Sequence, residues 1–258
     1  MSEQYFTKRQ NNLRTLFSKE NLDGMLITNL THIRYLCGFT GSAGSLLITH
    51  DKCEFITDGR YTLQAKNEVK GSNITISWDP HFTLIKKENL LPSNFKVGFD
   101  SNNVSHQIYT QLKDILSHVS WHGISGYVES LAMIKDKEEI DAIKTAVEIT
   151  DQAFSEVFPM IQIGIEEKEI ANQLSFLYRK YGDADADAFS PIVGSGIHSA
   201  MPHQRPTDKK IGPGELVVID SGAKYAGYHA DMTRTIATKG YSEKQKEIYD
   251  IVLEAQLK

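Results

Sequence analysis

The stretch Val217–Thr235, VVIDSGAKYAGYHADMTRT, has the pattern of two β-strands that meet in a turn, yet it contains two aspartates. Three apolar residues precede Asp220, and Asp231 lies between an alanine and a methionine. Gly222 and Gly227 bracket the region of the turn, as glycines do in many hairpins. The question is therefore why a hairpin with apolar flanks carries two acids.

The two-residue period of a strand predicts which side chains share a face. If the loop has an even number of residues and no bulge, Asp220 and Asp231 lie on the same face. A loop centred between Tyr225 and Ala226 places them directly opposite each other, with Cβ atoms about 4.5–5.5 Å apart. Thr233 shares that face. The pattern predicts an acid pair with a hydroxyl group beside it.

Two ionised carboxylates at this distance repel each other, and burial increases the cost. A shared proton relieves the repulsion, and so does a bound cation such as Mn²⁺ or Mg²⁺, which prefers oxygen ligands. A carboxylate that bridges two ions about 3.5–4 Å apart fits a two-metal hydrolase site, where Thr233 would orient a ligand carboxylate. Alternatively, both aspartates flank a turn on the surface, as aspartates commonly do. The apolar flanks favour the metal site.

A histidine precedes this hairpin in a proline-rich loop. His203 lies in the sequence Pro202-His-Gln-Arg-Pro206, where the prolines restrict the backbone. Histidine transfers protons and binds carbonyl groups near neutral pH. His203 is thus a candidate catalytic residue, and a histidine on a surface loop is the alternative.

Composition narrows the class of protein. The chain has 258 residues and a net charge of −5, which gives no electrostatic reason to expect nucleic acid or an anionic membrane as a partner. No apolar run is long enough to cross a bilayer, and the polar N-terminus has no signal-peptide core. Cys37 and Cys53 lack the spacing of a metal or redox pair, which favours reduced thiols. We expect a cytoplasmic protein.

The order of elements predicts two domains. Residues 1–126 alternate between strands and helices, which is typical of an α/β domain. Strands are expected near residues 25–28, 45–49, 54–57, 74–78 and 96–99, and helices near 7–21, 61–69 and 105–117. Residues 127–258 predict an α+β domain with helices after Asp136 and over 166–181, then strands between 188 and 238.

A last helix is expected to begin at Ser242, with Gln245 completing a capping box. Its apolar stripe, which includes Ile248 and Val252, has nothing after it in the sequence to cover it. We therefore expect the chain to be part of a longer protein.

Several segments together resemble a known family of enzymes. The segments 203–208, 214–223 and 227–235 strongly resemble Xaa-Pro aminopeptidases and prolidases, which share the "pita-bread" catalytic fold with methionine aminopeptidase. The segments Asn29–Ser42 and Thr57–Tyr61 are similar to the creatinase-type N-terminal domain. The resemblance implies a creatinase-like domain over 1–126 and an incomplete pita-bread metallopeptidase domain over 127–258.

The resemblance also implies a site with two divalent metal ions, usually Mn²⁺, with Co²⁺ or Zn²⁺ as alternatives. Family members bind the ions through two Asp, one His and two Glu. Asp220 and Asp231 match the two Asp, with Asp231 bridging the ions, and His203 matches a histidine that contacts the substrate. No residue of this chain matches the remaining His and two Glu. Because ligand number sets affinity, we expect weak or absent metal binding and no Xaa-Pro cleavage by these 258 residues alone.

The family implies an activity and an assembly. The leading prediction is an Xaa-Pro aminopeptidase, whose substrates are peptides with proline at the second position. In such an enzyme a water that bridges the two metals attacks the peptide bond. Relatives are commonly homodimers. One alternative is a prolidase that cleaves Xaa-Pro dipeptides. Another is a non-catalytic peptide-binding module with the pita-bread fold, which retention of both aspartates disfavours.

Overall fold

The structure is a computed structural model that describes residues 2–182 and 187–258. The chain divides into two compact units, Met1–Asp136 and Lys137–Lys258. The sequence placed the boundary earlier, at residue 126. Helix α6, Tyr127–Ala132, packs into the core of the first unit through Val128, which accounts for the later division. Within the described residues, no helix combines the length and the apolar content needed to cross a membrane.

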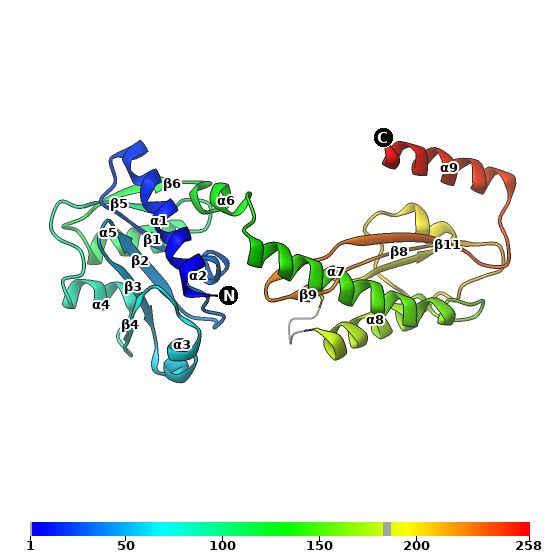
Figure 1. The fold of residues 1–258 in the computed structure, drawn as a ribbon, viewed down its shortest axis with the longest axis horizontal. Coiled ribbons are helices and arrows are strands. Elements are labelled where there is room, and N and C mark those ends of the chain that lie inside the picture. The colour runs from blue at the N-terminus through cyan, green and yellow to red at the C-terminus, as the bar shows by residue number, and fades with distance from the viewer. Residues whose placement is uncertain (1, 183–186) are drawn as a thin grey trace. The chain divides into compact units, whose positions relative to one another are not determined.

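The first unit is built on a six-stranded mixed sheet in the order β4-β3-β2-β1-β5-β6 (Figure 1). Strand β2 pairs antiparallel with β1 and β3, while the pairs β3–β4, β1–β5 and β5–β6 are parallel. The strands are β1 Gly24–Ile27, β2 Ser45–Thr49, β3 Cys53–Thr57, β4 Asn73–Ile76, β5 Lys96–Asp100 and β6 Ser120–Ile124.

Helices cover both faces of this sheet. Leu13 of α1 and Ile33 of α2 join one apolar cluster, whereas Leu84 of α4 and Leu112 of α5 join another. The strands are therefore buried on both faces, which explains their continuous apolar runs. The α/β prediction for this unit is confirmed. Its other helices are α1 Glu3–Glu20, α2 Leu30–Cys37, α3 Thr62–Glu68, α4 His81–Lys87 and α5 His106–Ile115, with a 3-10 turn at Gly59–Tyr61.

Short elements account for most differences from the expected pattern. Helices α2 and α4 have eight and seven residues, too few to show a helical period in the sequence. Strand β6 has the sequence SWHGI, which mixes polar and apolar residues without a clear alternation. Helix α1 begins at Glu3 rather than near Thr7, after Ser2 in an extended conformation.

The second unit contains a three-stranded antiparallel sheet in the order β11-β8-β7, and α7 and α8 lie side by side along one face of it (Figure 1). The strands of this sheet are β7 Ile192–Ser195, β8 Leu216–Ser221 and β11 Met232–Ala237, and β9 Lys224–Tyr225 pairs with β10 Tyr228–His229 in a separate two-stranded sheet. The helices of this unit are α7 Lys137–Val157, α8 Glu167–Tyr181 and α9 Glu243–Leu257, with 3-10 turns at Phe158–Met160 and Gly196–Ala200.

Burial alternates along β8 and decides which face each side chain takes. Val217 and Ile219 are fully buried against the two helices. Val218 and Asp220 are only partly buried and lie on the opposite face, because successive side chains alternate. The sheet thus presents Asp220 on the face that the helices leave open.

Helix α9 begins as the sequence predicts. Ser242 caps it, and Gln245 completes the capping box. The apolar residues Ile248, Ile251 and Val252 are each more than half exposed.

The hairpin closes with a tighter turn than expected. Tyr225 pairs with Tyr228, which leaves Ala226 and Gly227 as a two-residue loop. Their φ angles are 50° and 88°. Positive φ at both central residues is the mark of a type I′ turn, which matches the twist of the flanking strands. The turn is centred between Ala226 and Gly227, one residue later than the position that would place the two acids directly opposite each other.

This turn gives a test of the hairpin by stability. Alanine is strained at positive φ, whereas asparagine tolerates it, so Ala226→Asn should raise the free energy of unfolding by roughly 0.5–1 kcal/mol. Gly227→Ala should lower it by about 1 kcal/mol for the same reason. Denaturant unfolding of both variants measures the two effects. Equal stability of both variants and the parent would contradict the assigned turn.

Candidate active site

The register of β8 and β11 determines where the two acids lie. Asp220 pairs with Thr233 and not with Asp231. Asp231 directly precedes β11, two positions before Thr233, so it lies on the same face and diagonally from Asp220. The prediction of a shared face agrees with this register, and the prediction of direct opposition is wrong because the turn is centred one residue later.

Gly222 has a different role from the one its position suggested. It lies outside the turn, and a Cβ atom there would lie 1.8 Å from the carbonyl oxygen of Ala230. The two strands therefore approach each other so closely beside Asp231 that only glycine fits. This close approach fixes the backbone between the turn and the acid pair.

Asp220 is in an electrostatically unfavourable position. Burial raises the pKa of its carboxyl group, and the charge of Asp231 raises the pKa further, while Thr233 and His203 act in the opposite direction. Its Oδ1 atom is fully buried and accepts no hydrogen bond from the described part of the chain. An unsatisfied buried carboxylate oxygen costs free energy. A hard cation at this oxygen would remove that cost, so the residues present fit a divalent metal.

Asp231 and Thr233 are more accessible than Asp220. Both are exposed and line a cleft of about 1050 Å³. The other walls of the cleft include Thr150 of α7, Val252 of α9, and Ser199 in the 3-10 turn Gly196–Ala200. The acid pair therefore has one partly buried member, with one buried oxygen, and one member that faces open space, where a bound substrate could lie.

His203 lies in the loop between β7 and β8, and its side chain is exposed. Its electrostatic effect on Asp220 is to lower the pKa of that carboxyl group, and it is the smallest of the effects on Asp220. The strand register thus brings together Asp220, Asp231 and Thr233, and His203 is connected to them only by its effect on the pKa of Asp220.

A buried carboxylate holds the loop that carries His203, and no pattern in the sequence indicates it. Glu167, in the first turn of α8, is fully buried. It accepts hydrogen bonds from Ser195 N and Oγ at 2.8 and 2.9 Å, and from Thr207 N and Oγ1 at 3.2 and 2.8 Å. His198 Nδ1 lies 3.0 Å from both of its oxygens. One carboxylate therefore fixes both ends of the segment around His203.

The hydrogen bonds also set the charge of Glu167. Burial by itself would raise the pKa of this carboxyl group, but the donors on Ser195, Thr207 and His198 outweigh burial and keep the pKa below its ordinary value. Lys209 extends the network, since its Nζ donates to Ser195 Oγ at 2.8 Å and to Glu215 Oε2 at 2.7 Å. An acid in the first turn of a helix normally indicates only a favourable helix dipole, so no sequence signal separated Glu167 from its neighbour Glu166.

Loss of the Glu167 charge should destabilise the second unit. Glu167→Gln replaces an oxygen acceptor with an amide that faces donors, which should cost roughly 2–3 kcal/mol of unfolding free energy at pH 7. Because the folded-state pKa is lowered, the advantage of the parent exists above the unfolded pKa of about 4.3 and declines as pH falls through the folded pKa. Denaturant unfolding at neutral and acid pH measures this difference. The control is Glu169→Gln, an exposed acid in the same turn; an equal effect of the two substitutions would contradict the role of Glu167.

Known proteins that resemble the chain support one family. Residues 141–258 match metallopeptidase family M24, and residues 9–134 match the creatinase/prolidase N-terminal domain. An uncharacterized peptidase of Bacillus subtilis, YqhT, is 41% identical over 95% of this chain and 69% of its own length. A protein of Pyrococcus horikoshii named Xaa-Pro dipeptidase is 34% identical over 93% of this chain and 67% of its own length.

Solved structures agree with these matches. The structure of an Xaa-Pro dipeptidase from Bacillus anthracis has a TM-score of 0.92 and 38% identity, and the match covers 98% of this chain and 70% of that one. An X-Pro aminopeptidase from Thermotoga maritima has a TM-score of 0.85 and 36% identity, over 92% of this chain and 68% of that one. The chain therefore belongs to metallopeptidase family M24 and combines a creatinase-type N-terminal domain with part of the pita-bread domain.

Proposed function

We propose that the protein is a metal-dependent Xaa-Pro aminopeptidase, which releases an N-terminal residue that precedes proline. The observation that carries the proposal is the acid pair: Asp220 has a buried oxygen without a hydrogen-bond donor in the described chain, and Asp231 lies on the same face. The names of the matched relatives, which include both Xaa-Pro dipeptidase and X-Pro aminopeptidase, support the substrate class.

Each site residue has a role in the proposal. Asp220 and Asp231 would hold the divalent ions through their carboxylate oxygens. When bound, these ions would supply a water of lowered pKa as a nucleophile. Thr233 orients the carboxylate of Asp220 through its hydroxyl group, and His203 contacts the substrate and moves or holds a proton near its carbonyl group.

The proposal includes the metal, the assembly and the compartment. Mn²⁺ suits carboxylate ligands, with Co²⁺ and Zn²⁺ as alternatives. We also propose a homodimer, which the family resemblance supports, and a cytoplasmic location, which the composition supports. A non-catalytic peptide-binding module is the less favoured function, because Asp220 and Asp231 are both present and adjacent.

A prolidase is the second candidate, and two observations bear on it. Curated relatives from Pyrococcus horikoshii and Pyrococcus furiosus, 34% and 32% identical, are named Xaa-Pro dipeptidase, which favours a dipeptide substrate. The cleft beside Asp231 is about 1050 Å³, at the upper end of small-molecule sites, which favours a longer peptide.

Removal of either acid should abolish catalysis in the natural protein that carries this sequence. Asp220→Ala and Asp231→Ala should each lower kcat/KM for an Xaa-Pro peptide by at least about 100-fold, because each removes a charged ligand. Steady-state kinetics with added Mn²⁺, together with the metal content of the purified protein, measures the effect. Asp208→Ala, which removes an exposed aspartate, serves as the control. Parental turnover and metal content in either site variant would refute the assignment.

Substrate length separates the two candidate activities. An aminopeptidase should cleave an Xaa-Pro-Xaa tripeptide with a higher kcat/KM than the matching Xaa-Pro dipeptide, because the open cleft accepts residues after proline. The measurement compares both peptides on one preparation of the natural protein. Cleavage of the dipeptide alone would assign a prolidase instead, and cleavage of neither peptide by a metal-loaded protein would favour the binding module.

A further inference from the structure

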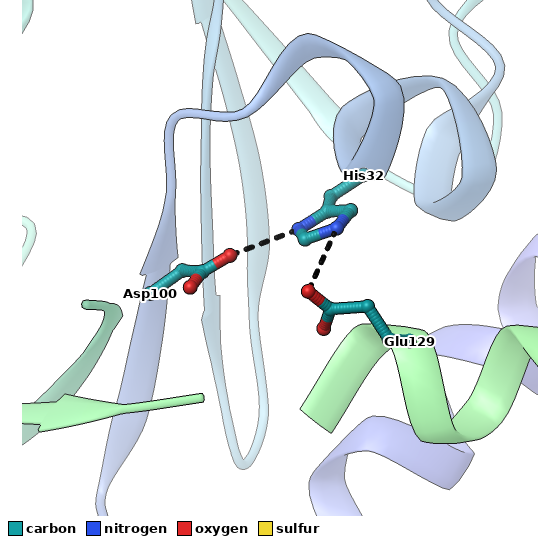
Figure 2. Close-up of side chains that lie close together, drawn as sticks. All are labelled: His32, Asp100 and Glu129. Carbon is teal, nitrogen blue, oxygen red and sulfur yellow. Dashed lines mark ion pairs between the residues drawn. The ribbon is translucent and has the colours of Figure 1, made fainter. Parts of the chain in front are cut away.

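A histidine and two carboxylates meet in the first unit, whereas the acid pair lies in the second. His32, Asp100 and Glu129 each offer one ligand atom, and these atoms lie within 4.8 Å of one another. His32 is in the first turn of α2, Asp100 ends β5 and Glu129 is on α6. Figure 2 shows the imidazole ring between the two carboxylates, with one ring nitrogen directed to each.

The contacts of the ring are too long for hydrogen bonds. His32 Nδ1 lies 3.4 Å from Asp100 Oδ2, and Nε2 lies 3.6 Å from Glu129 Oε1. N–H···O hydrogen bonds in proteins are about 2.7–3.2 Å long. The residue is 9% exposed, and its Nδ1 atom is buried without a hydrogen-bond partner in the described residues. A buried nitrogen directed at a carboxylate therefore lacks the interaction that burial normally requires.

The spacing suits two ligands of one metal ion. A tetrahedral ion with bonds of about 2.0–2.2 Å separates its ligand atoms by roughly 3.3–3.6 Å. The 3.4 Å between His32 Nδ1 and Asp100 Oδ2 fits one edge of such a tetrahedron. Glu129 is less constrained, with 45% of its side chain exposed, so it can turn toward an ion at that edge.

A network of asparagines fixes both of these ligands. Asp100 Oδ1 accepts a hydrogen bond from Asn102 N at 3.0 Å, and its Oδ2 accepts one from Asn103 Nδ2 at 2.5 Å. Asn29 Nδ2 donates to Asn103 Oδ1 at 2.7 Å, while Asn29 Oδ1 accepts from His32 N at 3.1 Å. The same network thus holds the carboxylate and the start of the helix that carries the histidine. Such outer hydrogen bonds orient metal ligands.

We propose that His32, Asp100 and Glu129 form a Zn²⁺ site in the first unit. One imidazole nitrogen and two carboxylates match the ligands that Zn²⁺ accepts, whereas Ca²⁺ and Mg²⁺ prefer oxygen alone. The two negative charges balance the ion, and water completes the coordination. The bound ion links α2, β5 and α6. The site is independent of the proposed peptidase function.

Calorimetry with ZnCl₂ at neutral pH tests the site on the full chain. The chain carries Asp220→Ala and Asp231→Ala, so that the acid pair does not contribute. We expect one Zn²⁺ per chain, with affinity at least tenfold weaker after His32→Ala or Glu129→Gln. His118→Ala is the matched control, because this histidine of the first unit is partly buried and bonds to Leu91 O. Its affinity should be unchanged.

Two results would overturn the proposal. The first is the absence of stoichiometric Zn²⁺ binding. The second is equal affinity of the parent and of Glu129→Gln for Zn²⁺. The side chain of Glu129 is 45% exposed, so this substitution should leave the fold intact. Circular dichroism checks that each variant is folded. NMR of the imidazole ring gives a separate readout: bound Zn²⁺ should shift the His32 resonances, whereas a protonated histidine paired with two carboxylates would leave them unchanged.

Discussion

The candidate active site depends on the packing of alternate residues of β8 against two helices. Val217 and Ile219 are fully buried in the cluster that α7 and α8 form, so the backbone cannot rotate without exposing them. Shifting the strand by one residue would bury Asp220 in that cluster and expose both apolar side chains. The position of the acid is thus a consequence of apolar burial one residue away.

Buried polar contacts fix the residues that follow Asp220 in the chain. Tyr178 of α8 donates a hydrogen bond to Ser221 Oγ at 2.8 Å, and Thr150 Oγ1 of α7 accepts one from Ala223 N at 2.9 Å. Burial raises the pKa of Tyr178 to about 12, so its hydroxyl remains a donor at neutral pH. These contacts lie directly after Asp220. The helices therefore hold the residues on both sides of the acid, which allows its carboxylate to be buried in an unfavourable environment.

The sequence predicts those parts of the fold that depend on neighbouring residues, and it does not predict those that depend on residues far apart in the chain. The apolar run before Asp220 predicted β8, and the box of Ser242 and Gln245 predicted the start of α9, because both signals are local. The centre of the turn was predicted one residue too early, because an alanine gives no sequence signal for the positive φ that Ala226 adopts. Gly222 was read as part of that turn, whereas the approach of Ala230 from the other strand explains it. Contacts between distant segments leave no mark in a local pattern.

Glu167 and His32 show the same limit for charged groups. The donors of Glu167 come from Ser195 and Thr207, and the carboxylates beside His32 come from β5 and α6, so only the folded chain brings them together. The two sites differ in how they meet the cost of burial. Glu167 is surrounded by donors, which lower the pKa of its carboxyl group. Asp220 and His32 each keep a buried atom without a hydrogen-bond partner in the described chain, and such an atom indicates a ligand more specifically than charge alone.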